Sequence, residues 1–102
     1  MSDEITASHI LIGFGDDSGR SQDEAKEKIE ALKSEIADGG DFAALAQTHS
    51  DCPSSAKGGD LGPFTRGMMV PEFDQAAFAL DTGAVSDIVE TSFGYHLITR
   101  TG

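Results

Sequence analysis

The stretch GGDLGPFTRGMMVPEFDQAAF, residues 58–78, changes character three times along its length. The pair Gly58-Gly59 predicts a turn, and residues 60–64 after it predict a brief strand or edge segment. Gly67 marks a second turn. Pro71 suits the first turn of a helix, where its missing N–H costs nothing. Apolar residues then recur at helical spacing: Phe73, Ala76, Ala77 and Leu80.

The same stretch holds more apolar side chains than an ordinary surface loop needs. They could fill the core beneath a loop. They could also line a pocket for an apolar ligand group, since methionine adapts its shape and aromatic faces accept flat rings. Both interpretations are open at this point, and both concern Leu61, Phe64, Met68, Met69, Val70 and Phe73.

The residues before this stretch predict one strand and two helices. The run 5–12, ITASHILI, has apolar groups on both faces, which indicates a central strand covered on both sides. Ser21 and Glu24 form a capping box that opens a helix. The glycine pair at 39–40 ends it, and Asp41 can cap a second, shorter helix. The first helix carries one apolar stripe: Ala25, Ile29, Leu32 and Ile36.

Further elements complete the order. We expect a single helical turn after Pro53, a short strand within 85–91 and a last strand over 95–100, YHLITR. The resulting order is strand, two or three helices, strand, helix, strand, strand. It predicts an α+β domain in which helices pack against a small antiparallel sheet. With 102 residues, the chain is expected to form a single domain, 1–102.

Charge and composition exclude several classes of partner. The formal net charge is −11, from 18 acidic and 7 basic residues, whereas nucleic-acid binding needs lysine and arginine to neutralise phosphates. The balance also disfavours anionic membranes and favours neutral or basic partners, or simply keeps the domain soluble. No apolar run approaches the roughly 20 residues of a membrane span. The N-terminus resembles no signal peptide, and a lone cysteine requires no oxidising compartment. We therefore expect a cytoplasmic monomer.

The chemically versatile side chains are three histidines and one cysteine, at positions 9, 49, 96 and 52. They have no dense metal-ligand spacing, so no metal is expected. His9 and His96 each lie within an otherwise apolar predicted strand, where a histidine is commonly a hydrogen-bonded core residue. If those strands are neighbours, the two imidazoles can hydrogen-bond and fix each other's tautomers, close to Cys52. A cysteine–histidine pair could also act as nucleophile and base.

Taken together, these pieces resemble the parvulin-type peptidyl-prolyl cis/trans isomerases. The matching motifs run in family order over nearly the whole chain: ASHIL at 7–11, Asp41-Phe42 with Leu45-Ala46, Ser50-x-Cys52-Pro53-Ser54, GGDLGPF at 58–64, GMMVPEF at 67–73 and FGYHLI at 93–98. The resemblance implies a four-stranded antiparallel sheet wrapped by about four helices, the parvulin/FKBP-like architecture.

The resemblance also implies roles for particular residues. His9 and His96 would be the paired histidines, and Cys52 the thiol that faces them. Prolyl-ring binding would fall to Leu61, Met69 and Phe73, while Thr91, Phe93 and Tyr95 would surround the histidines and the pocket rim. No cofactor is implied.

Some members of the family read a phosphate before the proline with basic residues in the loop after the first strand. Here the loop at 13–20 offers Arg20 against Asp16 and Asp17. We therefore expect isomerisation that is not directed by phosphate.

The implied reaction suits these residues. Rotation about an X–Pro bond faces a barrier of about 20 kcal/mol and takes tens of seconds unaided. The expected substrates are exposed proline-containing segments of folding or flexible proteins. The alternative is a peptide-binding chaperone module with little turnover. A redox or cysteine-hydrolase role for Cys52 lacks a second cysteine and an evident oxyanion hole.

Overall fold

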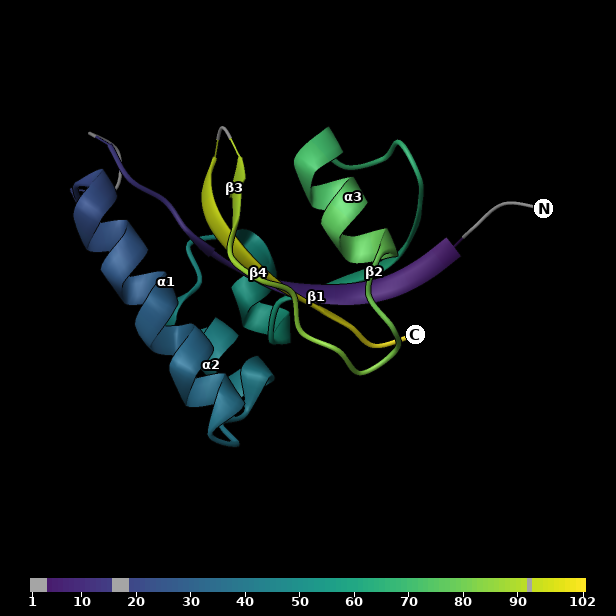
Figure 1. The fold of residues 1–102 in the computed structure, drawn as a ribbon, viewed down its shortest axis with the longest axis horizontal. Coiled ribbons are helices and arrows are strands. Elements are labelled where there is room, and N and C mark those ends of the chain that lie inside the picture. Colours follow the sequence, from purple (N-terminus) through teal and green to yellow (C-terminus); the bar gives the residue numbers. More distant parts are fainter. Residues whose placement is uncertain (1–3, 16–18, 92) are drawn as a thin grey trace.

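The structure, a computed structural model, describes residues 4–15, 19–91 and 93–102. Along these residues the elements follow the predicted order (Figure 1). They are β1 (Glu4–Ile12), α1 (Gln22–Ala37), α2 (Phe42–His49), the 3-10 helix η1 (Pro53–Lys57), β2 (Asp60–Thr65), α3 (Pro71–Phe78), β3 (Val89–Thr91) and β4 (Gly94–Arg100).

The helix starts are set by the residues that the sequence singled out. At α1 the Ser21 hydroxyl accepts the N–H of Glu24, and the Glu24 carboxylate accepts the N–H of Ser21, so the predicted capping box is confirmed. Asp41 caps α2 through the N–H of Ala43. Pro71 opens α3, as predicted.

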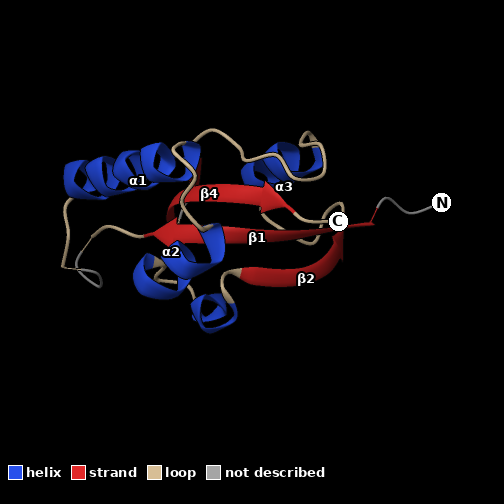
Figure 2. Cartoon of the chain, turned by 90° about the horizontal axis from the view of Figure 1, so that it is seen from below, coloured by secondary structure: helices blue, strands red, loops and turns tan. Residues whose placement is uncertain are grey.

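The four strands form one antiparallel sheet in the order β2-β1-β4-β3. The first and last strands of the chain are therefore neighbours at its centre, and Figure 2 shows β1 between β4 and β2. The pairing places Leu11 opposite His96 and His9 opposite Ile98. This register brings the odd-numbered side chains of β1 and the even-numbered ones of β4 onto one face of the sheet.

Two buried clusters cover the two faces of the sheet. One joins α1 and α2 to the sheet through Ile10, Ile12, Ala25, Ile29, Leu32, Ala46, Tyr95 and Leu97. The other joins α3 to the opposite face through Ile5, Ala7, Phe64, Phe73, Ala77 and Ile98. β1 is buried over most of its length, which confirms the prediction of a central strand covered on both sides.

The helices lie at different ends of the sheet. In Figure 1, α1 runs beside one end and α3 lies beside the other. The residues at the C-terminus return to β1, where the N–H of Thr101 donates to the carbonyl of Thr6 at 2.8 Å. Within the described residues no helix is both long and apolar enough to cross a membrane.

Candidate active site

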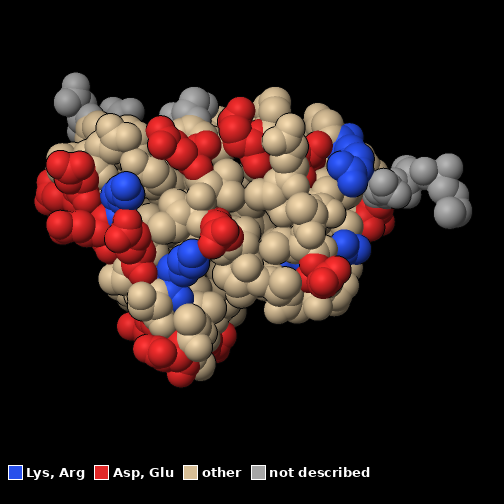
Figure 3. Space-filling view, viewed as in Figure 1, with Lys and Arg blue, Asp and Glu red and all other residues tan. Residues whose placement is uncertain are grey.

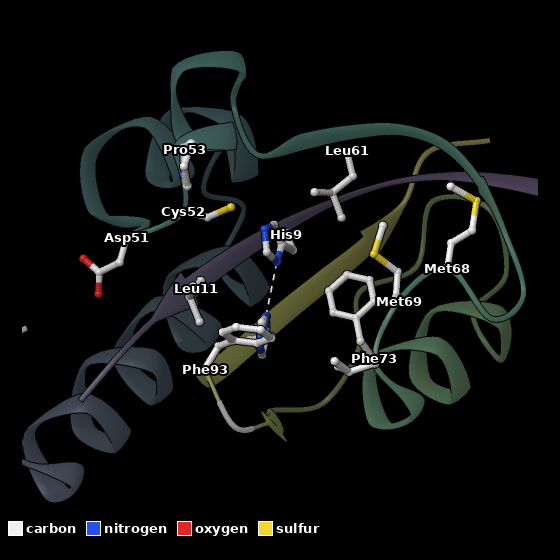
Figure 4. A pocket seen from close by; sticks show the side chains of 12 residues that line it. His9, Leu11, Asp51, Cys52, Pro53, Leu61, Met68, Met69, Phe73 and Phe93 are labelled. Atoms are coloured by element: carbon white, nitrogen blue, oxygen red, sulfur yellow. Dashed lines mark hydrogen bonds between the residues drawn. The ribbon is translucent and has the colours of Figure 1, made fainter. Parts of the chain in front are cut away.

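A pocket of about 500 Å³ opens on the α3 face of the sheet, and β1, β2, β4, η1, α3 and three connecting segments contribute to it (Figure 4). Its wall is mostly apolar. The twelve lining residues are His9, Leu11, Asp51, Cys52, Pro53, Leu61, Met68, Met69, Val70, Phe73, Phe93 and His96.

The floor of the pocket is a pair of stacked imidazoles. Nδ1 of His9 lies 3.2 Å from Nδ1 of His96, and their ring centroids are 5.3 Å apart with an interplanar angle of 21°. The ring of Phe73 meets both edge-on, at centroid distances of 5.4 and 5.5 Å. The predicted histidine pair therefore exists, because β1 and β4 are adjacent and the two side chains share a face.

A hydrogen-bond chain continues from this pair toward the β3–β4 turn. The Thr91 hydroxyl lies 2.7 Å from Nε2 of His96 and also accepts the N–H of Phe93 at 3.1 Å. At the other end, Nε2 of His9 is buried and has no partner among the described residues. His9 therefore keeps one buried ring nitrogen for which the described residues supply no hydrogen bond.

Burial makes both imidazoles neutral at physiological pH. It lowers the pKa of His9 to about 4, and it lowers the pKa of His96 to about 4 with a further contribution from the neighbouring His9. A neutral imidazole has one donor and one acceptor nitrogen, so this pair can hydrogen-bond without any charge in the pocket.

Cys52 approaches the pair from the segment between α2 and η1. It is a free, partly buried cysteine, and Figure 4 shows its sulfur pointing into the pocket on the side of His9. Pro53 begins η1 directly after it, and Gly58 ends η1 in the left-handed conformation. The sequence-predicted set of His9, Cys52 and His96 is therefore gathered around one cavity.

The predicted apolar wall is also assembled. Leu61 comes from β2, Met69 from the turn before α3, and Phe73 from the first turns of α3. Phe73 is buried, and the ring of Phe64 packs behind it at a centroid distance of 6.2 Å. The two interpretations of this stretch both hold, since Phe64 fills core while Met69 and Phe73 present a surface to the pocket.

Three further predicted residues have different positions. Phe93 lines the pocket and is 62% exposed at its rim. Thr91 lies beneath the pocket as the hydrogen-bond partner of His96. Tyr95 does not line it, and its prediction as a rim residue is wrong. Successive residues of β4 point to opposite faces, so Tyr95 packs into the α1 side, where its hydroxyl accepts Nε2–H of Gln22 at 3.0 Å.

Sequence reasoning missed several lining residues. Leu11 follows His9 by two positions in β1, so strand alternation was a sufficient signal. Met68 and Val70 were not missed, because the sequence had already placed both in the apolar excess that could line a pocket. Asp51 gave no such signal, because its place depends on how the segment before η1 meets the end of β1.

Asp51 is the one charged residue among those that line the pocket, and it forms an ion pair. Its Oδ2 lies 2.6 Å from Nη1 of Arg20 and accepts the N–H of Gly13 at 2.9 Å. Nη1 of Arg20 also donates to the carbonyl of Gly13 at 2.8 Å. The predicted acidic pair of this loop, Asp16 and Asp17, lies outside the described residues. No cluster of side chains that could hold a metal occurs in the part of the chain that the structure describes.

Comparison with known proteins identifies the family of this chain. The model of the PPIC-type PPIase domain matches residues 1–102. The chain belongs to the parvulin-type peptidyl-prolyl cis/trans isomerases. It is 41% identical over 116 residues to peptidyl-prolyl cis-trans isomerase Pin1 of Digitalis lanata, covering 99% of this chain and 98% of the relative. The solution structure of TbPIN1 superposes with a TM-score of 0.91 at 33% identity, over 100% of each chain.

The family also includes domains of larger proteins. The chain is 43% identical over 94 residues to the chaperone SurA of Burkholderia thailandensis, covering 92% of this chain but 20% of that protein. The parvulin architecture and the isomerase activity predicted from the sequence are thereby confirmed.

Proposed function

We propose that this isomerase acts on X–Pro bonds in unfolded or flexible protein segments and does not require a phosphate before the proline. The observation that carries the proposal is an apolar pocket above a neutral, buried histidine pair. Among the described residues that line the pocket, the one charged side chain, Asp51, is already paired with Arg20.

The pocket suits a prolyl ring held against Leu61, Met69 and Phe73. No covalent bond needs to break, because the barrier falls once the amide loses its resonance. A dry site that offers a hydrogen bond to the prolyl nitrogen favours the twisted amide over the planar one. His9 and His96 are neutral, and both line the same pocket as Cys52. We assign them a polarising, non-covalent role.

The rim favours segments that expose apolar side chains. Met68 is 65% exposed and Phe93 is 62% exposed, although large apolar side chains are normally buried in a soluble domain. Both belong to the pocket lining. A proline flanked by apolar residues would cover them, and such sequences are accessible mainly in unfolded or flexible chains.

The charges at the mouth argue against phosphate recognition. A phosphate reader needs arginine or lysine side chains that can form paired hydrogen bonds to the phosphate oxygens. The guanidinium of Arg20 already bonds Asp51, so a phosphate that displaced it would meet the released carboxylate of Asp51. We expect this repulsion to cancel most of the binding free energy that the phosphate would gain from Arg20.

An isomerisation assay on matched peptides tests the proposal. Ala-Pro, Leu-Pro, Arg-Pro, Glu-Pro and phosphoserine-Pro peptides are compared by NMR exchange or by a protease-coupled assay. We expect turnover of the unphosphorylated peptides, with Leu-Pro above Ala-Pro. Turnover confined to phosphoserine-Pro would refute the proposal.

A second activity is suggested by relatives called chaperone SurA and foldase protein PrsA. The exposed apolar rim fits a domain that also holds unfolded chains without isomerising them. Suppression of aggregation by a variant with no measurable isomerase activity would support this addition. The cytoplasmic location and the monomeric state stay predictions.

A further inference from the structure

We infer that Ser50 and Asp51 are positioning residues that fix the Cys52 thiol against the histidine pair, by docking the segment before η1 onto the end of β1. The inference deepens the proposed function, since its kinetic part rests on the role proposed for Cys52.

β1 has an edge that β2 leaves uncovered. The pairing of β1 with β2 reaches Ser8 and Asp60, and the N–H of His9 then donates to the carbonyl of Gly59 at 2.9 Å. Beyond this point Leu11 and Gly13 would present unpaired backbone groups at the mouth of the pocket. Leu11 and Gly13 are half-buried, so leaving these backbone groups without a partner costs free energy to the extent that water cannot reach them.

Residues 50 and 51 supply that partner. The N–H of Leu11 donates to the hydroxyl of Ser50 at 3.0 Å, and the carbonyl of Leu11 accepts the N–H of Asp51 at 2.7 Å. The N–H of Gly13 donates to the carboxylate of Asp51 at 2.9 Å. The two residues thus continue the edge of β1 where β2 stops, using two side chains and one backbone group.

The same contacts fix the position of the Cys52 backbone. The hydroxyl of Ser50 also lies 3.4 Å from the N–H of Cys52, so one oxygen binds both Leu11 and Cys52. Arg20 donates to the same carboxylate oxygen of Asp51 and also to the carbonyl of Gly13. After Cys52, the 3-10 helix returns the chain to Gly59, which bonds His9. Cys52 is therefore carried by a segment fixed to β1 both before and after it.

Ser50 and Asp51 could stabilise the fold without positioning the thiol, so the test needs a measurement on the thiol of Cys52 itself. Cys52 is the one cysteine of the chain, and its alkylation by uncharged iodoacetamide can be followed without ambiguity. The alkylation rate does not depend on isomerase activity. It therefore tests the position of the thiol even if the proposed substrates are wrong.

Four variants and one control are compared. Ser50→Ala and Asp51→Ala remove the side-chain bonds, whereas Ser50→Thr and Asp51→Asn keep an acceptor oxygen at each position. Ser54→Ala is the matched control, because the buried Ser54 hydroxyl lies two residues from Cys52 and has no hydrogen-bond partner among the described residues. Kinetics with a Leu-Pro peptide, alkylation rates and thermal melts are measured for each.

We expect Ser50→Ala and Asp51→Ala to lower kcat about tenfold with little change in KM, since small displacements of a reacting group are costly. Their alkylation rates should change at least threefold, to about the same extent in the two variants. Ser50→Thr and Asp51→Asn should reverse most of the change in kcat and alkylation rate that the alanine variants show, because each keeps an acceptor oxygen. Ser54→Ala should stay within about twofold of the parent in both readouts, because it removes no hydrogen bond among the described residues.

Two results would overturn the inference. One is a lower melting temperature in Ser50→Ala with unchanged kcat and alkylation, which indicates a purely structural role. The other is an equal effect of Ser54→Ala. If Asp51→Ala does not fold, Ser50→Ala decides by the same criteria. If the parent protein shows no isomerase activity, the proposed function is refuted. If the alkylation rate of Ser50→Ala still differs from that of the parent, the positioning role is nevertheless supported.

Discussion

His9 and His96 show how two ordinary strand residues acquire unusual properties by meeting. Each ring takes the other and Phe73 as neighbours, and each loses most of its contact with water. Burial penalises the charged form, so both imidazoles stay neutral well below the usual histidine pKa. A neutral pair can then hydrogen-bond, which two imidazolium rings cannot do.

The histidine pair predicts a particular pH dependence of stability. The folded pKa values of about 4 lie below the unfolded value of 6.5, so the unfolded chain binds more protons as the pH falls. The contribution of the two histidines to the free energy of unfolding is fully present above pH 6.5 and is lost as the pH falls from 6.5 toward 4. Between pH 7.5 and 5.5 we expect a loss of roughly 1 kcal/mol per histidine, measured by urea unfolding.

A variant without the pair provides the control. His96→Ala removes the hydrogen-bond partner of His9, which should cost about 1–3 kcal/mol at pH 7.5. Its stability should also depend less on pH over the same interval. A parent domain whose unfolding free energy is constant from pH 7.5 to 5.5 would contradict the buried, neutral pair.

The apolar wall makes a separate prediction. Met69→Ala and Phe73→Ala should each lower kcat/KM at least tenfold, because each removes roughly 1–3 kcal/mol of contact with a prolyl ring. Leu80→Ala is the control, since Leu80 packs on the same cluster without lining the pocket. Circular dichroism at the assay temperature verifies folding. Intact, fully active Met69→Ala and Phe73→Ala would place the prolyl ring elsewhere.

At the scale of elements, local signals explain what the sequence could predict. The capping box of Ser21 and Glu24, Pro71 at the start of α3 and the alternation of β1 all depend on neighbouring residues, and all are confirmed. The resemblance to the parvulin family added what local signals could not, namely the antiparallel sheet and the pairing of His9 with His96. One failure, at Tyr95, neglected a local signal, whereas the others depended on tertiary contacts. Tyr95 was assigned to the rim although alternation along β4 sends it to the other face.

The limits of other elements also required the three-dimensional structure. β3 covers only Val89–Thr91 of the predicted region, because its pairing with β4 ends at Val89 and His96. Val85 instead forms an isolated bridge with Thr99. Asp51 entered the site through bonds to Leu11 and Gly13, about forty residues away in sequence. No short-range pattern encodes such a contact.

Gly59 makes an element-scale prediction because η1 must return close to β1. Its φ is +84°, and an added Cβ would collide with the carbonyl oxygen of His9. Gly59→Ala should therefore cost more than the roughly 1 kcal/mol of a strained φ alone and should displace the segment beside His9. Gly83→Ala is the control, since its φ is +90° but the space around it is open. Equal melting temperatures for the two variants would show that Gly59 is not sterically constrained.

The whole molecule is strongly acidic, and its net charge of −11 acts on every peptide that approaches it. In Figure 3 acidic groups form several patches on the visible face, with fewer basic groups, on a surface made mostly of other residues. Close to the pocket the described charge is the Asp51–Arg20 pair, which is nearly neutral as a unit. Any charge preference should therefore come mainly from the surrounding field and should be sensitive to salt.

The residue before proline tests this field. At low salt we expect Arg-Pro to exceed Glu-Pro several-fold in kcat/KM, because exposed carboxylates contribute at most about 1 kcal/mol each. The difference should narrow near molar salt, because the Debye length falls from about 30 Å at 0.01 M to about 3 Å at 1 M. Asp16→Lys combined with Asp17→Lys should shrink or reverse it if the loop after β1 contributes. Equal rates for the two peptides at low ionic strength would show that the acidic surface does not act on the bound peptide.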